Sequence, residues 1–148
     1  MPAKRAKESV WDYPRPPRVE PTSRRIQVFF GGEQIADSRR ALRVLETTHP
    51  PAYYLPREDV RMDRLAPAQG VTWCEWKGRA VYFDIAAGGQ KTPKAAWSYP
   101  DPSPSFEAIR DHIAFYPGKM EACLVDGERA RPQPGGFYGG WITDDVVL

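Results

Sequence analysis

Cys74 and Lys77 have the clearest chemical potential in this sequence, because a thiol and an amine lie three residues apart. A thiolate is the reactive form of cysteine, and a nearby cation stabilises it. Lys77-Gly78 predicts a tight turn that could direct the amine back over the sulfur. One hypothesis is therefore an enzyme that uses Cys74 or Lys77 covalently. The alternative is that Cys74 is a small strand residue that packs inside the protein.

Aromatic side chains concentrate in the same middle part of the chain. They are Tyr53, Tyr54, Trp73, Trp76, Tyr82, Trp97 and Tyr99, with Lys77, Arg79 and Lys94 nearby in sequence. Rings with polar tips suit a partly solvated pocket wall, and basic groups can hold an anionic substituent such as phosphate. The pattern favours a pocket for a small anionic or nucleotide-like molecule, although core packing alone explains many of these rings.

Several other kinds of site have no counterpart in the sequence. There is no GxSxG nucleophile elbow, no GxxxxGK[ST] phosphate loop and no GxGxxG dinucleotide signature. The soft metal ligands are His49, Cys74, His112 and Cys123, and no two of them have zinc-site spacing. We therefore expect no metal site, and neither a cofactor nor a catalytic set follows from the motifs.

Acidic residues offer little more. The pairs Asp144-Asp145, Glu58-Asp59 and Asp126 with Glu128 fall in turns or tails, where carboxylates are usually solvated. Asp37 stands at a strand end beside Arg39. It either orients a ligand or ties a turn through Asx bonding, and the turn is favoured.

Strands must position these side chains. The chain has 148 residues, room for one domain, and its 16 prolines and 12 glycines suit short strands and turns better than a helical bundle. Residues 26–30 and 33–38 predict a hairpin through Gly31-Gly32. Further strands are expected at residues 41–45, 52–55, 71–76, 79–85, 94–99, 114–116 and 120–125.

One short helix is expected after Ser103 and Pro104, which suit a cap and a first position. Phe106, Ile109 and Ile113 follow at spacings of three and four. The glycine-rich tail around Phe137, Tyr138 and Trp141 predicts irregular structure. The fold class is therefore mainly β, a small sandwich or barrel of short strands with one short helix.

Residues 1–24 predict a basic, proline-rich arm, and residues 25–148 a single β domain. The first 25 residues carry seven basic and three acidic side chains, whereas the remainder carries 14 basic and 16 acidic ones. Because the positive charge lies outside the folded part, nucleic acid is an unlikely partner. The PxxP pattern of Pro14 and Pro17 suits an interaction module, or the arm packs on its own domain through Trp11 and Tyr13.

The chain has no apolar run of the roughly 18 residues that a membrane span needs. No apolar segment follows the charged N-terminus, so no secretory signal is expected. With two cysteines and no sign of an oxidising compartment, the expected location is the cytoplasm.

Several segments resemble domain-of-unknown-function family 427, sometimes labelled nucleotidyltransferase-like. They are residues 31–38, 53–56 with 58–60, 72–78 with Ala80 and Tyr82, 96–100 and 113–116. The resemblance implies a compact, predominantly β fold. A nucleotidyltransferase generally needs a carboxylate pair for magnesium beside a phosphate loop, and the sequence shows neither.

The resemblance singles out the same positions as the aromatic and basic pattern. The residues expected to bind the ligand are Tyr54, Thr72, Cys74, Lys77, Tyr82, Trp97 and Tyr99. In this hypothesis Tyr54, Trp97 and Tyr99 wall the ligand or stack on it. Lys77 then supplies charge and Thr72 a hydroxyl.

Overall fold

Strands dominate the computed structural model, which describes residues 5–135 and 138–148. The strands are β1 (Glu8–Ser9), β2 (Arg18–Pro21), β3 (Ile26–Phe30), β4 (Glu33–Ser38), β5 (Leu42–Leu45), β6 (Ala52–Tyr54), β7 (Leu65–Cys74), β8 (Gly78–Ala87), β9 (Gln90–Pro102), β10 (Ala114–Phe115), β11 (Ala122–Val125), β12 (Glu128–Arg129), β13 (Arg131–Pro132), β14 (Trp141–Ile142) and β15 (Val146–Val147). Short 3-10 helices η1 (Val10–Asp12), η2 (Arg57–Asp59), η3 (Met62–Arg64), η4 (Pro104–Ile109) and η5 (Pro117–Lys119) join them. The mainly-β prediction is confirmed.

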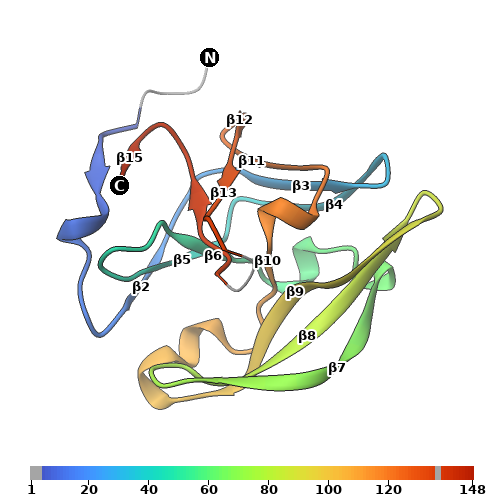
Figure 1. Ribbon diagram of the computed structural model, residues 1–148, viewed down its shortest axis with the longest axis horizontal. Helices are drawn as coiled ribbons and strands as arrows, with labels where there is room; N and C mark the ends of the chain where they lie inside the picture. The colour runs from blue at the N-terminus through green and yellow to red at the C-terminus, as the bar shows by residue number, and fades with distance from the viewer. Residues whose placement is uncertain (1–4, 136–137) are drawn as a thin grey trace.

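Three sheets hold most of the strand residues (Figure 1). The strand orders are β10-β9-β8-β7, β12-β11-β3-β4 and β2-β5-β6, with two short pairs, β1-β15 and β13-β14. Within the described residues these sheets stay separate and do not close into a barrel. No helix in this part of the chain is long and apolar enough to cross a membrane.

Strand β9 is longer than the sequence pattern suggests. It runs from Gln90 to Pro102 although it contains Pro93 and Pro100. Strand β10 pairs with β9 only at Ala96 and Trp97, so these prolines lie where one edge of β9 is free of that partner. The prolines therefore limit the pairing of β10 with β9, while β9 itself continues through both of them.

Both faces of β9 are buried between Ala95 and Tyr99. On one side lies the larger core, with Val28, Ile35 and Phe115. Val44, Tyr54, Phe106 and Ile109 form a second core around Trp97 and Tyr99. The same strand therefore belongs to two hydrophobic clusters.

The helix predicted after Ser103 is the 3-10 helix η4, which ends at Ile109. Phe106 and Ile109 are buried as their spacing predicts, but the capping role of Ser103 is wrong. Its hydroxyl instead donates to the carbonyl of Trp76 in the β7–β8 turn, and Phe106 has a non-helical φ of −117°. The segment is thus fastened to the sheet instead of extending as an α-helix.

The described part of the N-terminal arm is built into the domain. Strand β1 pairs in parallel with β15, and β2 pairs with β5. Tyr13 is buried, whereas Trp11 is 69% exposed. Glu8 receives two hydrogen bonds from the buried guanidinium of Arg43, at 2.9 and 3.0 Å. The arm packs on its own domain through Tyr13 and Glu8, and not through Trp11.

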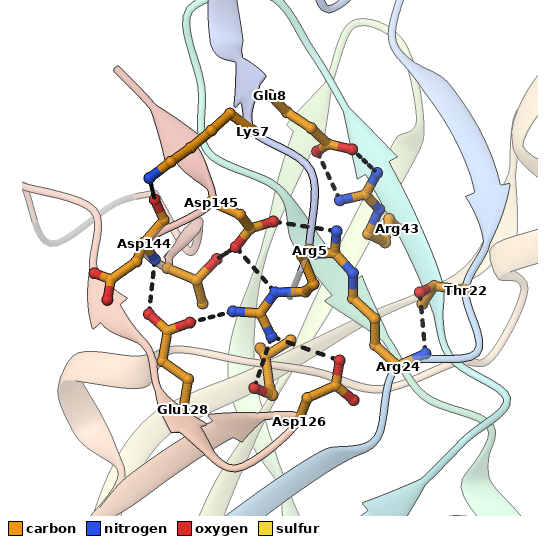
Figure 2. Close-up of polar contacts among 12 residues, drawn as sticks. Arg5, Lys7, Glu8, Thr22, Arg24, Arg43, Asp126, Glu128, Asp144 and Asp145 are labelled. Atoms are coloured by element: carbon orange, nitrogen blue, oxygen red, sulfur yellow. Dashed lines mark hydrogen bonds and ion pairs between the residues drawn. The ribbon is translucent and has the colours of Figure 1, made fainter. Parts of the chain in front are cut away.

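Asp145, near the C-terminal end of the chain, forms ion pairs with two arginines near the N-terminal end. Its carboxylate lies 3.2 Å from Arg5 and 3.1 Å from Arg24, as Figure 2 shows. Arg5 also contacts Asp126 and Glu128. Asp145 is only 4% exposed, so the expectation of a solvated carboxylate is wrong for this residue. Two guanidinium groups compensate the charge that the tail buries.

Acid should weaken the packing of the arm on the domain through Glu8. Burial opposes ionisation of Glu8, but hydrogen bonds from Arg43 and Tyr13 outweigh it and lower the pKa of Glu8 below its ordinary 4.5. The unfolded chain therefore takes up this proton first as pH falls, and stability declines below about pH 4.5. We expect Glu8→Gln to cost about 2 kcal/mol at pH 7 and to flatten the acid decline. Urea unfolding at several pH values measures both, with exposed Glu58→Gln as control. An equal loss in the two variants would contradict the assignment.

Two hairpin turns touch through their backbones. An added Cβ at Gly31 would lie 2.1 Å from the Ala87 oxygen, and one at Gly88 would lie 1.9 Å from the Gly31 oxygen. Gly32 and Gly89 share the positive φ but face open space.

We expect Gly32→Ala and Gly89→Ala to lower the free energy of unfolding by about 1–2 kcal/mol because of the positive φ alone. Gly31→Ala and Gly88→Ala should cost a further ~1–3 kcal/mol for the overlap. Chemical unfolding compares the four variants, and equal losses would rule out the backbone contact.

Candidate functional site

A cavity of about 350 Å³ opens beside the second hydrophobic core. All seven residues that the sequence predicts as ligand-binding line it: Tyr54, Thr72, Cys74, Lys77, Tyr82, Trp97 and Tyr99. They come from β6, β7, the β7–β8 turn, β8 and β9. These seven residues, which lie up to 45 positions apart in sequence, therefore contribute side chains to one hollow.

Strand alternation explains how these side chains meet. Thr72 and Cys74 are two residues apart on β7, and Trp97 and Tyr99 are two apart on β9, so each pair points to one face of its strand. Tyr82 on β8 pairs with Trp97 in the sheet. Register thus places the wall of the cavity across three neighbouring strands.

The turn of residues 75–77 brings Lys77 back to Cys74. Cys74 pairs with Gly78, which has a φ of +105°, and closes a three-residue loop. The Nζ of Lys77 donates to the Sγ of Cys74 at 3.4 Å. It also lies 5.9 Å from the Tyr99 ring centre and 5.8 Å from that of Phe106. The expectation that this turn could join the amine and the thiol is therefore met by the geometry.

Lys77 is only 9% exposed. Within residues 5–135 and 138–148 its ammonium has no carboxylate within ion-pair distance. The thiol and two ring faces are the partners that surround it. A buried cation without a counter-ion is costly unless a polar or anionic group joins it.

Tyr54, Trp97 and Tyr99 form the floor of the cavity. The indole Nε1 of Trp97 donates to the Tyr54 hydroxyl at 3.1 Å, and the two rings meet edge to face. The Tyr54 and Tyr99 rings lie 6.3 Å apart. Burial is the main cause that raises the pKa of both phenols. They remain neutral hydroxyls over the physiological range.

The Thr72 and Tyr82 side chains make a polar stretch of the wall. Their hydroxyl oxygens lie 2.8 Å apart in a mutual hydrogen bond. Tyr116 also lines the cavity, and its ring centre lies 4.5 Å from that of Trp97. Burial raises the pKa of Tyr116 as well. The wall therefore offers neutral hydroxyl groups beside flat apolar surface.

Part of the rim comes from the glycine-rich tail, which the sequence predicted to be irregular and did not assign to the site. Gln133, Tyr138, Gly139 and Gly140 all line the cavity. Gln133 bonds to His49 at 3.0 Å and accepts from the Gly140 backbone at 3.1 Å. A Cβ on Gly139 would lie 2.2 Å from the Trp97 ring. The close approach of Gly139 to an indole is invisible in sequence, and Phe137 lies outside the described residues.

Some predicted contributors lie elsewhere. Arg79 and Lys94 do not line the cavity, so the basic contribution is that of Lys77. Tyr53 points into the larger core, where its hydroxyl accepts from Arg24 at 3.0 Å. Trp73 borders the cavity but is 75% exposed.

Asp37 neither ties a turn nor reaches the cavity. It accepts two hydrogen bonds from Arg25, at 3.0 and 2.8 Å. These bonds, with the charge of Arg25, lower the pKa of its carboxyl against a smaller opposing effect of burial. Its role is an ion pair between β4 and Arg25, the residue that precedes β3, so the Asx-turn prediction is wrong.

Metal ligands do not gather in the described part of the chain. No group of three or more His, Cys, Asp or Glu side chains there could hold a metal ion. His49 and Cys74 line the cavity, whereas His112 and Cys123 do not. The groups available for chemistry at the cavity are therefore a thiol, an amine, an imidazole, phenolic hydroxyls and the carboxylates of Glu46 and Glu75.

Fold and site together define a small mainly-β domain with an aromatic-walled cavity. A family model described as "Domain of unknown function (DUF427)" matches residues 18–126, and the chain belongs to this family. No curated protein matches the chain. The matched region includes all seven predicted residues, whereas Gln133 and residues 138–140 of the rim lie beyond it.

The two thiols should differ sharply in reactivity. Cys74 lines the cavity, whereas Cys123 is 1% exposed and burial raises its pKa far above the ordinary value. Because the protonated thiol is unreactive, we expect iodoacetamide to label Cys74 in the folded protein at pH 8 and to leave Cys123 intact. Peptide mass spectrometry reads the labels, and denatured protein should label at both positions. Faster labelling of Cys123 would contradict this packing.

Proposed function

We propose that this protein is a domain that binds a small anionic or nucleotide-like molecule in the cavity of Lys77. The observation that carries the proposal is the Lys77 ammonium, which lies in an aromatic hollow without a carboxylate partner among the described residues. An anionic group on a ligand would supply the missing charge. It would form a charge-assisted hydrogen bond in a site partly shielded from water.

The dimensions of the cavity suit a small ligand. Its volume of about 350 Å³ lies at the lower end of the roughly 300–1,000 Å³ of typical ligand sites. Trp97 and Tyr99 give it flat apolar surface, which favours a planar ring such as a nucleobase. The hydroxyls of Thr72 and Tyr82 can orient a polar substituent.

The remaining charges limit the class of ligand. Glu46 and Glu75 also border the cavity and would repel a highly charged polyanion. We therefore favour a ligand with one anionic group over a nucleic acid. Both cysteines are free, which suits a reducing compartment, and a cytoplasmic location is part of the proposal.

The arm is a weaker candidate for a binding function of its own. Strands β1 and β2 already pair with the domain, so capture of a partner along the arm would have to compete with these contacts. Trp11 is a large apolar side chain of the arm that is exposed and that such a partner could contact.

Thermal-shift measurements with nucleoside monophosphates and sugar phosphates test the proposal. A ligand at about 100 times its Kd stabilises the folded state by about 2.7 kcal/mol, and so should raise Tm by several degrees. We expect Lys77→Met to abolish the shift because it keeps the length of the side chain and removes its charge. Lys91→Met, at an exposed position near the start of β9, should retain the full shift. A panel without any stabilising ligand, or an undiminished shift in Lys77→Met, would count against the proposal.

A further inference from the structure

The Lys77 amine and the Cys74 thiol at the cavity wall lie close enough for a group carried on the thiol to be transferred to the amine. Lys77 Nζ and Cys74 Sγ lie 3.4 Å apart, and Lys77 is the last residue of the loop that the Cys74–Gly78 pairing closes. An acyl group carried on this sulfur would have its carbonyl carbon within reach of the amine. Such proximity converts an intermolecular reaction into an intramolecular one and accelerates it strongly.

We propose that Cys74 accepts an acyl group from a small thioester and passes it to the Nζ of Lys77, which makes Lys77 a self-acylation site. The exposed lysines among the residues that the structure describes make no contact with a thiol. Lys91, for example, contacts Asp84 at 3.8 Å. The inference adds a modification to the cavity, and its effect on the ligand rests on the proposed function.

The first step is transfer of the acyl group between two sulfurs. The Cys74 thiolate attacks the carbonyl carbon of the donor thioester, a new C–S bond forms and the bond to the donor sulfur breaks. The departing thiolate takes a proton from the Lys77 ammonium and leaves as a thiol. This transfer leaves Lys77 as a neutral amine beside the new thioester, which is the form that can attack it.

In the second step the acyl group moves from sulfur to nitrogen. The lone pair of Lys77 Nζ attacks the thioester carbon, a C–N bond forms and the bond to Cys74 Sγ breaks. The proton released by the nitrogen goes to the sulfur, so the products are an amide on Lys77 and a regenerated Cys74 thiol. No oxidant, metal or nucleotide takes part in either step.

The surroundings of Cys74 and Lys77 favour the acyl transfer. Cys74 is half-buried and lines the cavity, so a small donor can reach it. The ring centres of Tyr99 and Phe106 lie 5.9 and 5.8 Å from the Lys77 amine, so these side chains limit the space in which it can move. Acylation would remove the positive charge of Lys77, and with it the group that we propose to hold the ligand's anion.

Incubation of the whole chain with N,S-diacetylcysteamine tests the relay. We expect Lys77 to be acetylated on the order of tenfold or more faster than Lys91. In Cys74→Ala its rate should fall to that of Lys91, although the amine is still present. Peptide mass spectrometry measures both positions in one sample. Cys74→Ser, with its fold checked by circular dichroism, is a second variant that removes the thiol.

Lys77→Arg isolates the first step. Because arginine is not an acyl acceptor here, the acetyl group should remain on Cys74 as a thioester that hydroxylamine removes, whereas the amide on Lys77 resists hydroxylamine. Equal acetylation of Lys77 with and without the Cys74 thiol would overturn the relay. So would the absence of any acetyl group on Cys74 and Lys77 when Lys91 is modified.

The outcomes separate this inference from the proposed function. Acetylation of Lys77 through Cys74 without a thermal shift from any anionic ligand keeps the relay and removes the binding proposal. Ligand shifts without acetyl transfer keep the binding proposal and remove the relay. If both hold, acetylated protein should lose the ligand-induced shift as Lys77→Met does.

Discussion

Burial of both faces of β9 between Ala95 and Tyr99 is the constraint on which the architecture depends. A strand with one face in solvent needs other elements to pack on its second face only, but this segment of β9 needs packing partners on both faces. The β3–β4–β11 sheet and its neighbours supply the partners on one face, and β5, β6 and η4 supply those on the other. The domain therefore consists of several small sheets arranged around one strand, and the arm contributes β2 to the second set of partners.

The same constraint links the cavity to the core. Trp97 and Tyr99 belong to the second hydrophobic cluster and also form the cavity floor. Their positions are fixed by packing from behind, by the Trp97–Tyr54 hydrogen bond and by the β8–β9 register. The aromatic side chains of the cavity floor are therefore held in place by packing, hydrogen bonding and strand register. The turn that carries Lys77 is fastened separately, since Lys77's carbonyl accepts from the Ser103 backbone at 3.0 Å.

Sequence patterns reveal the local features of this molecule better than the distant ones. Alternation in residues 26–38 predicts the first hairpin, because this signal lies within two strands joined by a tight turn. The aromatic residues with Lys77 predict the cavity wall, because most of them lie on β7, β8 and β9, which follow one another in sequence and pair in one sheet. The burial of Asp145 and the role of Gly139 could not be predicted, since each depends on a partner far away in sequence, Arg5 or Trp97. The sequence pattern predicts too short a strand at β9, because the effect of a proline on a strand depends on which edge of the strand it occupies.

The contact between the Gly31 and Gly88 turns also limits how the protein can vary in length. Two hairpin tips that meet backbone to backbone leave no room for an inserted residue on either side. The Asp126-Gly127 turn differs, because Gly127 faces open space. Asp126 itself is held by Arg5 and by the Arg25 backbone. Epitope tags, fluorophores or natural insertions should therefore be accommodated after Gly127, on the edge hairpin of β11 and β12, while the other two tips keep a fixed number of residues.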